Sequence, residues 1–445
     1  MNPDLMTNND VSTRLEKNKT LPSGSTELDV IEIADGDTSD HGTSLSPSAS
    51  EVEDETLLNQ PTISMVSTVK KPLEAPSSPQ TKVLFLDGVR GLAAMLVYLQ
   101  HSHDFGPGLS PGGIGVDIFF VLSSFLLTWL FMKKSMKLLA QGANLRTWSY
   151  VLVDYFQKRF LRVYPLFFVT VVILALMTPE EQERYFTFNR PPLDILRTLI
   201  FEFDYRYHVF WSLPLEIAYY FVIPVFVMAV LGMRRFWWVS ALPLAVWVVY
   251  EGFYTIRSNH MPMRPHISTF LTGSLAAVVF VKLDLWMKKK EFEFRWWHTI
   301  IVRAVEWLTI GTLLSVSFCG LLFTWVHSNP APPIGGEPYI SSLVSTIIVV
   351  EMIHPSWVST MFEWNVLCYC GKISFSVYLM HPFVVENTRE DNQPYYYDRL
   401  FSRLFLIPIL ATATYYLVEY PSLLLAQRIS RHLTAQEKKA MVGAI

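Results

Sequence analysis

GIGVDIFFVLSSFLLTWLFM, residues 113–132, contains a single ionisable side chain, Asp117. A helix of about 20 such residues spans a hydrocarbon core roughly 30 Å thick. In lipid every backbone polar group must be paired within the protein, and the chain shows no alternating pattern of the kind that barrel strands require. The segment therefore predicts a transmembrane helix.

Similar apolar runs recur from Val83 onward, each long enough to cross a membrane. About ten spans are predicted, near 84–103, 113–132, 160–178, 209–231, 236–255, 266–286, 303–326, 339–361, 366–385 and 402–425. The predicted fold class is an all-α, polytopic membrane helix bundle.

The composition also indicates lipid as the solvent. Of the 445 residues, 51% are hydrophobic and 17% are charged, whereas soluble chains approach a quarter charged. A net charge of −3 argues against a nucleic-acid-binding protein, which needs a concentrated basic surface. The three cysteines, Cys319, Cys368 and Cys370, form no disulfide framework or zinc signature, so no metal site is predicted.

The polarity of the chain changes sharply near residue 80. Residues 1–80 are rich in Ser, Thr, Asp, Glu and Pro and predict a disordered cytosolic tail. Residues 81–427 form the predicted transmembrane domain, and 428–445 a short cytosolic tail. Lys and Arg gather in alternate connections and in both tails, so both termini are expected in the cytosol. Which membrane holds the protein is left open.

The first predicted span supplies two of the ionisable side chains that are functional candidates. Arg90 and His101 are eleven residues apart, about three helical turns and roughly 16 Å, so they share one helix face. A long donor could have its anionic end held by Arg90 while its reactive end reaches His101, whose imidazole suits proton transfer near neutral pH. Alternatively, Arg90 is an interfacial anchor and His101 a helix-end residue.

An arginine pair precedes the third predicted span. In YFQKRFLRVYP, Arg159 and Arg162 lie on one helix face at i, i+3, where two guanidinium groups could clamp phosphates. Positive residues at the cytosolic end of a span give the same pattern without any ligand. Both interpretations stay open.

HVFWSLPLEIAYYFVIPVF, residues 208–226, places Glu216 one turn into a span, with His208 and Trp211 at its outer end. Glu216 could orient an imidazole, accept a proton or pair with an arginine; a purely structural ion pair is the alternative. Trp211 has the position of an interfacial belt residue and is also a candidate for a substrate cavity.

Three further ionisable residues lie near span ends. Asp117 follows the glycines of GGIG, which permit close helix approach, and could cap a frayed helix end. His381 in GKISFSVYLMH and Glu419 in VEYP could line a cavity, although a histidine before proline is often only an end residue.

Taken together, LDGVRGLAAMLVYLQHSH, GVDIFFVLSSFLLT, RFLRVYP, WSLPLE, GKISFSVYLMH and VEYP resemble the acyltransferase-3 family of membrane O-acyltransferases, and its fungal members most closely. The resemblance runs from about residue 84 to 425. It implies a catalytic role for His101, whose spacing from Arg90 matches the family signature, and a role in donor binding or activity for Arg159 and Arg162. Glu216 matches the acid of the WSLxxE stretch.

The sequence departs from the family pattern at two places. Ser124 stands where the family usually has glycine, which argues against close helix packing at this position. IAYY follows Glu216 where bacterial members often carry a second acid and Gln, so bacterial acceptor specificity does not carry over.

The resemblance implies a membrane-bound O-acyltransferase. It would move an acyl group, acetyl above all, from cytosolic acyl-CoA to a hydroxyl of a small (secondary) metabolite, glycan or lipid. Acyl-CoA is a co-substrate, and no permanently bound cofactor is expected. Its phosphates would meet Arg90, Arg159 and Arg162, while His101 deprotonates the acceptor or relays the acyl group, oriented by Asp117 or Glu216.

Two other classes of protein share parts of this pattern. A secondary transporter could use intramembrane His, Glu and Arg as a proton relay, although residues 84–425 do not divide into matching halves. A non-catalytic assembly or sensor protein would keep the helix bundle and bind no donor.

Overall fold

A computed structural model describes residues 79–102, 111–255, 262–318, 321–323, 338–387 and 394–442. The chain divides into two compact units, Met1–Ala75 and Pro76–Ile445, and all described residues belong to the second. The predicted N-terminal tail lies outside the described residues except for its last two, which begin the first helix. Every regular element within the described ranges is a helix, which confirms the all-α class.

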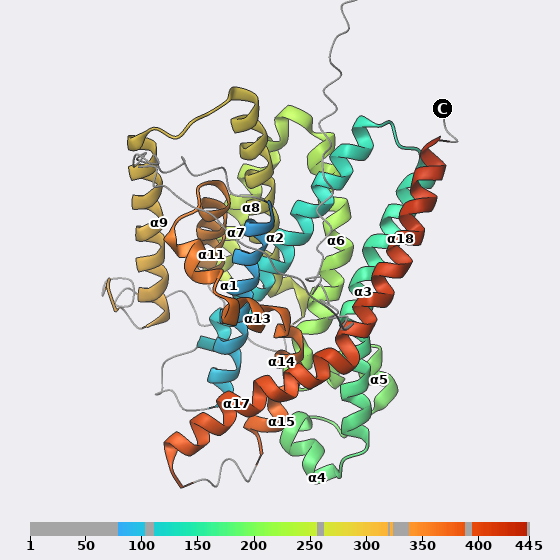
Figure 1. The fold of residues 1–445 in the computed structure, drawn as a ribbon. Coiled ribbons are helices and arrows are strands. Elements are labelled where there is room, and N and C mark those ends of the chain that lie inside the picture. Colours follow the sequence, from blue (N-terminus) through green and yellow to red (C-terminus); the bar gives the residue numbers. More distant parts are fainter. Residues whose placement is uncertain are drawn as a thin grey trace, which may run out of the picture. The chain divides into compact units, whose positions relative to one another are not determined.

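Figure 1 shows the helices and carries most of the α-helix labels used below. In chain order they are α1 (Pro79–His101), α2 (Pro111–Ala140), α3 (Leu145–Ala175), α4 (Pro179–Gln182), η1 (Glu183–Thr187), α5 (Ile195–Leu199), η2 (Phe203–Tyr205), η3 (His208–Trp211), α6 (Ser212–Gly232), η4 (Arg234–Phe236), α7 (Trp237–Tyr254), α8 (Met263–Lys290), α9 (Trp296–Ser317), α11 (Pro338–Ile353), α12 (Trp357–Phe362), α13 (Asn365–Lys372), α14 (Ser374–Met380), α15 (Pro382–Val385), α17 (Tyr396–Thr414), η5 (Tyr415–Glu419) and α18 (Tyr420–Val442).

Five helical stretches of the described chain are long and apolar enough to cross a membrane. They are Pro111–Ala140, His208–Gly232, Met263–Lys290, Trp296–Ser317 and Tyr396–Met441, and Ile340–Ile353 is a shorter apolar helix. The multi-pass membrane fold is therefore supported, whereas the predicted count of about ten spans is not confirmed.

The predicted span 366–385 is the clearest local difference. Three short helices, α13, α14 and α15, occupy this range. Pro382 has no N–H to donate and begins α15, so the helix is interrupted at His381. The interruption places a histidine at a junction between helices inside the bundle.

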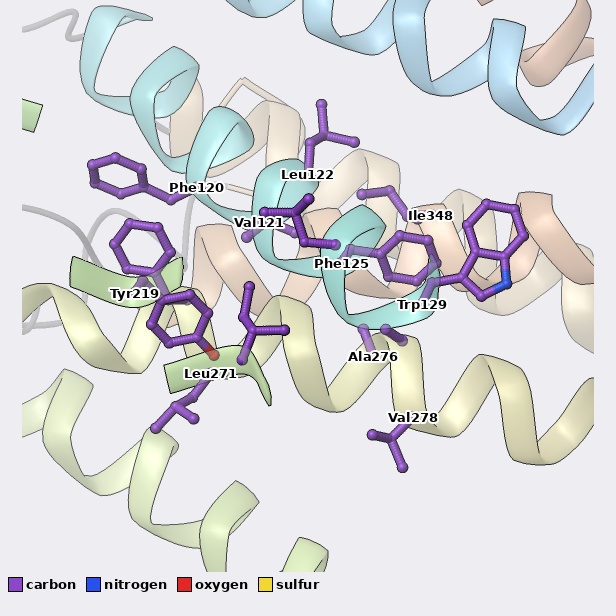
Figure 2. Close-up of a cluster of buried hydrophobic side chains, with 14 of the residues drawn as sticks. Phe120, Val121, Leu122, Phe125, Trp129, Tyr219, Leu271, Ala276, Val278 and Ile348 are labelled. Atoms are coloured by element: carbon purple, nitrogen blue, oxygen red, sulfur yellow. The ribbon is translucent and has the colours of Figure 1, made fainter. Parts of the chain in front are cut away.

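The core of the bundle lies between α2, α6 and α8, and Figure 2 shows a part of it. Phe120 of α2 stacks on Phe270 of α8 with ring centroids 4.4 Å apart, and Tyr219 of α6 stacks on the same ring at 4.7 Å. Hydroxyl groups join the same three helices, because Ser274 lies 2.8 Å from Thr128 and 2.7 Å from Tyr219. Apolar packing and interhelical hydrogen bonds together fix these helices, as is usual in membrane bundles.

Glycines allow α1 to lie very close to its neighbours. A Cβ on Gly88 would fall 1.7 Å from the carbonyl oxygen of Phe362, and a Cβ on Gly371 would fall 1.9 Å from that of Asp87. On its other side, α1 meets α2 at Gly115, where a Cβ would lie 2.7 Å from the oxygen of Ala93. The predicted role of the α2 glycines in close helix approach is confirmed.

Ser124 does not prevent close packing of α2, because the opposite helix supplies the glycine. A Cβ on Gly273 of α8 would lie 2.1 Å from the Ser124 hydroxyl oxygen and 2.5 Å from the carbonyl oxygen of Val121. The Ser124 hydroxyl donates to the carbonyl of Phe120 at 2.8 Å, so it is satisfied within its own helix. The expectation of looser packing at this position is wrong.

The C-terminal helix α18 packs along α3 and continues past Arg428 to Val442. In Figure 1, α17 and α18 form two arms that meet at η5. Lys134 of α2 lies 3.1 Å from Glu437, and the side chain of Asn144 donates to the carbonyl of Ala440 at 3.4 Å. The basic segment between α2 and α3 and the chain's last helix thus lie at the same end of the bundle.

Candidate active site

His101 is the last residue of α1 and is half-buried. Its Nδ1 lies 2.8 Å from the carbonyl oxygen of Val97, one turn earlier. A carbonyl can only accept, so Nδ1 must carry the proton, and in the neutral ring Nε2 is then the basic nitrogen. The helix end therefore fixes the tautomer that a base or nucleophile needs at Nε2.

Two more histidines surround His101. The ring centroids of His208 and His381 each lie 5.0 Å from that of His101, and 6.3 Å from each other. They come from η3 and from the junction of α14 with α15, so three distant segments meet here. His381 was predicted as a cavity candidate, whereas His208 was noted only as a neighbour of Glu216.

His208 lies close to a carboxylate. The His208 Nε2 is 3.9 Å from Oε1 of Glu386, the residue that follows α15. His208 also has a φ of 29°, a left-handed conformation that is strained for a residue with a side chain. Glu386 was not predicted from the sequence; its place five residues after the histidine of GKISFSVYLMH is the signal that could have suggested it.

Hydrogen bonds join two of these three segments. The Tyr378 hydroxyl, one turn before His381, donates to the carbonyl of Val209 at 2.9 Å and lies 2.7 Å from the Ser212 hydroxyl. These contacts tie α14 to the segment that carries His208.

Arg403 of α17 holds the same histidine cluster from another side. Its buried guanidinium donates to the carbonyl of Ser102 at 2.8 Å and to that of Val385 at 3.4 Å. Ser102 follows His101 and Val385 precedes Glu386, so one arginine positions both functional segments. Nothing in the sequence around Arg403 distinguished it from an ordinary charged residue in a helix.

Arg90 lies on α1 three turns before His101, as predicted from the spacing. It forms an ion pair with Asp87 at 2.7 Å, and its side chain is 14% exposed. A donor anion meeting Arg90 would therefore share the guanidinium with a carboxylate of the same helix.

Arg159 and Arg162 project from α3 one turn apart. Within the described residues the Arg159 Nε is buried without a hydrogen-bond partner, and its guanidinium lies 5.4 Å from the Tyr155 ring centroid. Both arginines are within electrostatic range of Tyr220 on α6. A buried guanidinium N–H without an acceptor is uncommon and fits an anion-binding role.

Glu216 belongs to the surroundings of this arginine pair. Its Oε1 accepts hydrogen bonds from Ser123 of α2 at 2.6 Å and from Tyr220 at 2.8 Å. Tyr220 in turn lies near both arginines, so Glu216 stands beside the candidate donor clamp as a counter-charge. From the sequence, Glu216 could orient an imidazole, accept a proton or pair with an arginine, with a purely structural ion pair as the alternative.

Asp117 and Trp211 are both deep in the bundle. Asp117 is 2% exposed on α2, so it is no frayed helix end. Trp211 is 6% exposed, and its ring lies 6.1 Å from Phe120 and 5.3 Å from His266. The interpretation of Trp211 as an interfacial belt residue is wrong, because neighbouring helices cover it. Its place in a substrate cavity stays a prediction.

The arrangement thus has a basic site on α3 and an imidazole cluster at the end of α1. Residues 83–418 match the family described as "Acyltransferase domain", the acyltransferase-3 family. The chain belongs to this family. Membership confirms the resemblance seen in the motifs and makes the bundle an acyltransferase-3 domain.

Two relatives of the acyltransferase-3 domain come from Staphylococcus aureus. A protein of strain COL, provisionally named an O-acetyltransferase, is 25% identical over 370 residues, which cover 76% of this chain and 56% of the relative. The O-acetyltransferase OatA of strain NCTC 8325 is 23% identical over 357 residues, covering 74% and 54%. The chain spans about half the length of these curated relatives. No solved structure shows significant similarity to it.

Proposed function

We propose that the protein transfers an acyl group from acyl-CoA to a hydroxyl-bearing acceptor. The acyl group is acetyl, in keeping with the names of the O-acetyltransferase relatives. The acceptor is a small metabolite, a glycan or a lipid. The observation that carries the proposal is the imidazole cluster around His101 on the same helix as Arg90, within an acyltransferase-3 domain.

The donor binds by its phosphates at the basic end of the bundle, which faces the cytosol in this proposal. Arg159 and Arg162 form the clamp and Arg90 adds a third positive charge. Glu216 accepts a hydrogen bond from Tyr220, which has both arginines as electrostatic neighbours, so its negative charge offsets part of theirs. The pantetheine arm then runs along α1 toward His101, about 16 Å from Arg90 by helix rise.

The reaction moves one proton from the attacking hydroxyl group to the leaving thiolate. The acceptor oxygen attacks the thioester carbonyl, the C–O bond forms, the C–S bond breaks, and the proton of the hydroxyl ends on the CoA sulfur. His101 lies at the reacting end and handles this proton. Burial inside the bundle excludes water and limits hydrolysis of the thioester.

The proposal is tested by thioester consumption. Purified protein in lipid nanodiscs is given acetyl-CoA with a panel of hydroxyl probes, namely glycerol, glucose and ergosterol, and CoA release and acetyl ester are both measured. Acetyl ester formed in step with CoA release supports acyl transfer. Absence of ester with every probe overturns it and favours the transporter, which predicts flux without transfer.

The arginine pair should determine donor affinity. Replacing Arg159 and Arg162 together by alanine is expected to weaken CoA binding at least 10-fold, because each charge-assisted contact to a phosphate contributes about 1.5–3 kcal/mol. Binding of radiolabelled CoA to the purified protein measures the effect. Arg146→Ala, at the exposed start of the same helix, is the matched control. Unchanged affinity in a folded double variant would contradict the clamp.

A further inference from the structure

His381 has an unsatisfied nitrogen in the middle of the candidate site. Its side chain is 0% exposed, and its Nδ1 lies 3.2 Å from the carbonyl oxygen of Val377. As in His101, the carbonyl fixes the proton on Nδ1, which leaves a lone pair on Nε2. Within the described residues Nε2 forms no hydrogen bond. Buried polar atoms without a partner are rare, and this one awaits a donor such as a hydroxyl.

Only one of the two neighbouring imidazoles is expected to carry a second proton, and with it a positive charge, at a time. His101 and His381 have ring centroids 5.0 Å apart, and two positive charges at this distance in a buried site repel strongly. The two rings therefore titrate as a coupled pair. Over the pH range in which the pair binds one extra proton, it offers one acid and one base.

The surroundings decide which ring holds the proton. His381 is completely buried, and burial disfavours a charged ring. His101 is half-buried, and on its other side His208 lies 3.9 Å from the Glu386 carboxylate. The negative charge of Glu386 favours a proton on the His208 and His101 side. The Tyr378 hydroxyl is another titratable group near His381; the two ring centroids lie 6.1 Å apart, and the hydroxyl contacts Ser212 and Val209. The Arg403 guanidinium, bound to the carbonyls of Ser102 and Val385, adds a fixed positive charge beside the cluster.

We propose that His381 and His101 divide the acid–base work: His381 Nε2 takes the proton of the acceptor hydroxyl, and His101 delivers a proton to the departing thiolate. Deprotonation accompanies formation of the C–O bond, and protonation of sulfur accompanies cleavage of the C–S bond. The proton then passes from His381 to its neighbour His101, which restores the starting state with no net gain or loss. This inference rests on the proposed acyl transfer and gives His381 a catalytic role.

The two roles are separated by changing the leaving group. S-(4-nitrophenyl) thioacetate releases a thiolate that needs no proton, whereas acetyl-CoA releases one that does. With acetyl-CoA, both His101→Gln and His381→Gln are expected to lower kcat by at least about 100-fold, the usual contribution of acid–base catalysis. With the aryl thioester, the loss in His101→Gln should shrink to about 10-fold or less, while the loss in His381→Gln persists.

The controls make each result decisive. His432→Gln, an exposed histidine on α18, receives the same substitution and should keep wild-type activity. CoA affinity should stay within about 3-fold in all three variants. A wild-type rate in His381→Gln, an equal loss with both donors in both variants, or recovery of His381→Gln by the aryl thioester would each overturn the division of roles. No ester formation by the wild-type protein would instead reject the proposed function itself.

If the variants do not fold, the pH dependence of the wild-type protein tests whether His101 and His381 divide the acid and base roles. Catalysis by the coupled pair requires a neutral His381 as the base and a protonated His101 as the acid. This requirement predicts a bell-shaped dependence of kcat on pH. A single base predicts a rising curve with a plateau. A plateau between pH 6 and about 9, flanked only by an acid limb, would overturn the proposal.

Discussion

Replacement of His101 by glutamine is expected to lower turnover by about 10²- to 10⁴-fold, the range in which a positioned acid–base group contributes. Glutamine can still donate to the carbonyl of Val97, so the helix end should keep its structure, but it cannot exchange a proton. The rate of acetyl ester formation from acetyl-CoA measures the effect. Donor affinity should hardly change, because Arg159 and Arg162 lie on another helix.

The His101 experiment needs a readout of folding, since a damaged membrane protein also loses activity. Monodisperse elution in detergent and a melting temperature close to that of the wild type show that the variant is intact. An intact variant with wild-type turnover would remove His101 from the mechanism and leave the imidazole cluster without its proposed function.

The second large effect is structural. Gly88→Ala should destabilise the bundle by about 3 kcal/mol, at the upper end of overpacking losses. The new Cβ would lie 1.7 Å from the Phe362 carbonyl oxygen, and because this atom is backbone, α1 and the chain leading into α13 must move apart. Arg90 and His101 belong to α1, so acyl transfer should fail as well.

Gly232→Ala is the matched control for this helix contact. Gly232 ends α6, and a Cβ there meets no atom within 4 Å. Thermal unfolding of both variants in the same detergent gives the comparison. Equal melting temperatures for the two would show that the contact at Gly88 can relax without loss.

The class of fold was predictable because lipid restricts the choices. Uninterrupted apolar runs such as 113–132 have only the helix available to them, and the structure contains α2 there. The predicted number of about ten spans, by contrast, is not confirmed. Residues 366–385 read as one apolar run, yet they form three short helices, the last of which begins at Pro382.

The site was predictable where one helix determines it. The spacing of Arg90 and His101 follows from helical geometry, and both lie on α1 as expected. The meeting of His101, His208 and His381 depends on tertiary packing, which no periodicity reveals. Glu216 shows the same difficulty, because its hydrogen bonds to Ser123 and Tyr220 are set by the approach of α2 and by its own helix face. The interruption at Pro382, for its part, explains how His381 reaches the end of α1.

The contacts of Arg403 carry a consequence for related sequences. Its guanidinium binds carbonyl oxygens at positions 102 and 385, and every amino acid supplies such an oxygen. Homologues can therefore exchange the side chains at these two positions during evolution while the histidine and glutamate beside them keep their geometry. The arginine itself has no such freedom, since lysine lacks the planar fork that reaches two acceptors at once. An alignment of close homologues should show an invariant arginine at position 403 and variable residues at positions 102 and 385.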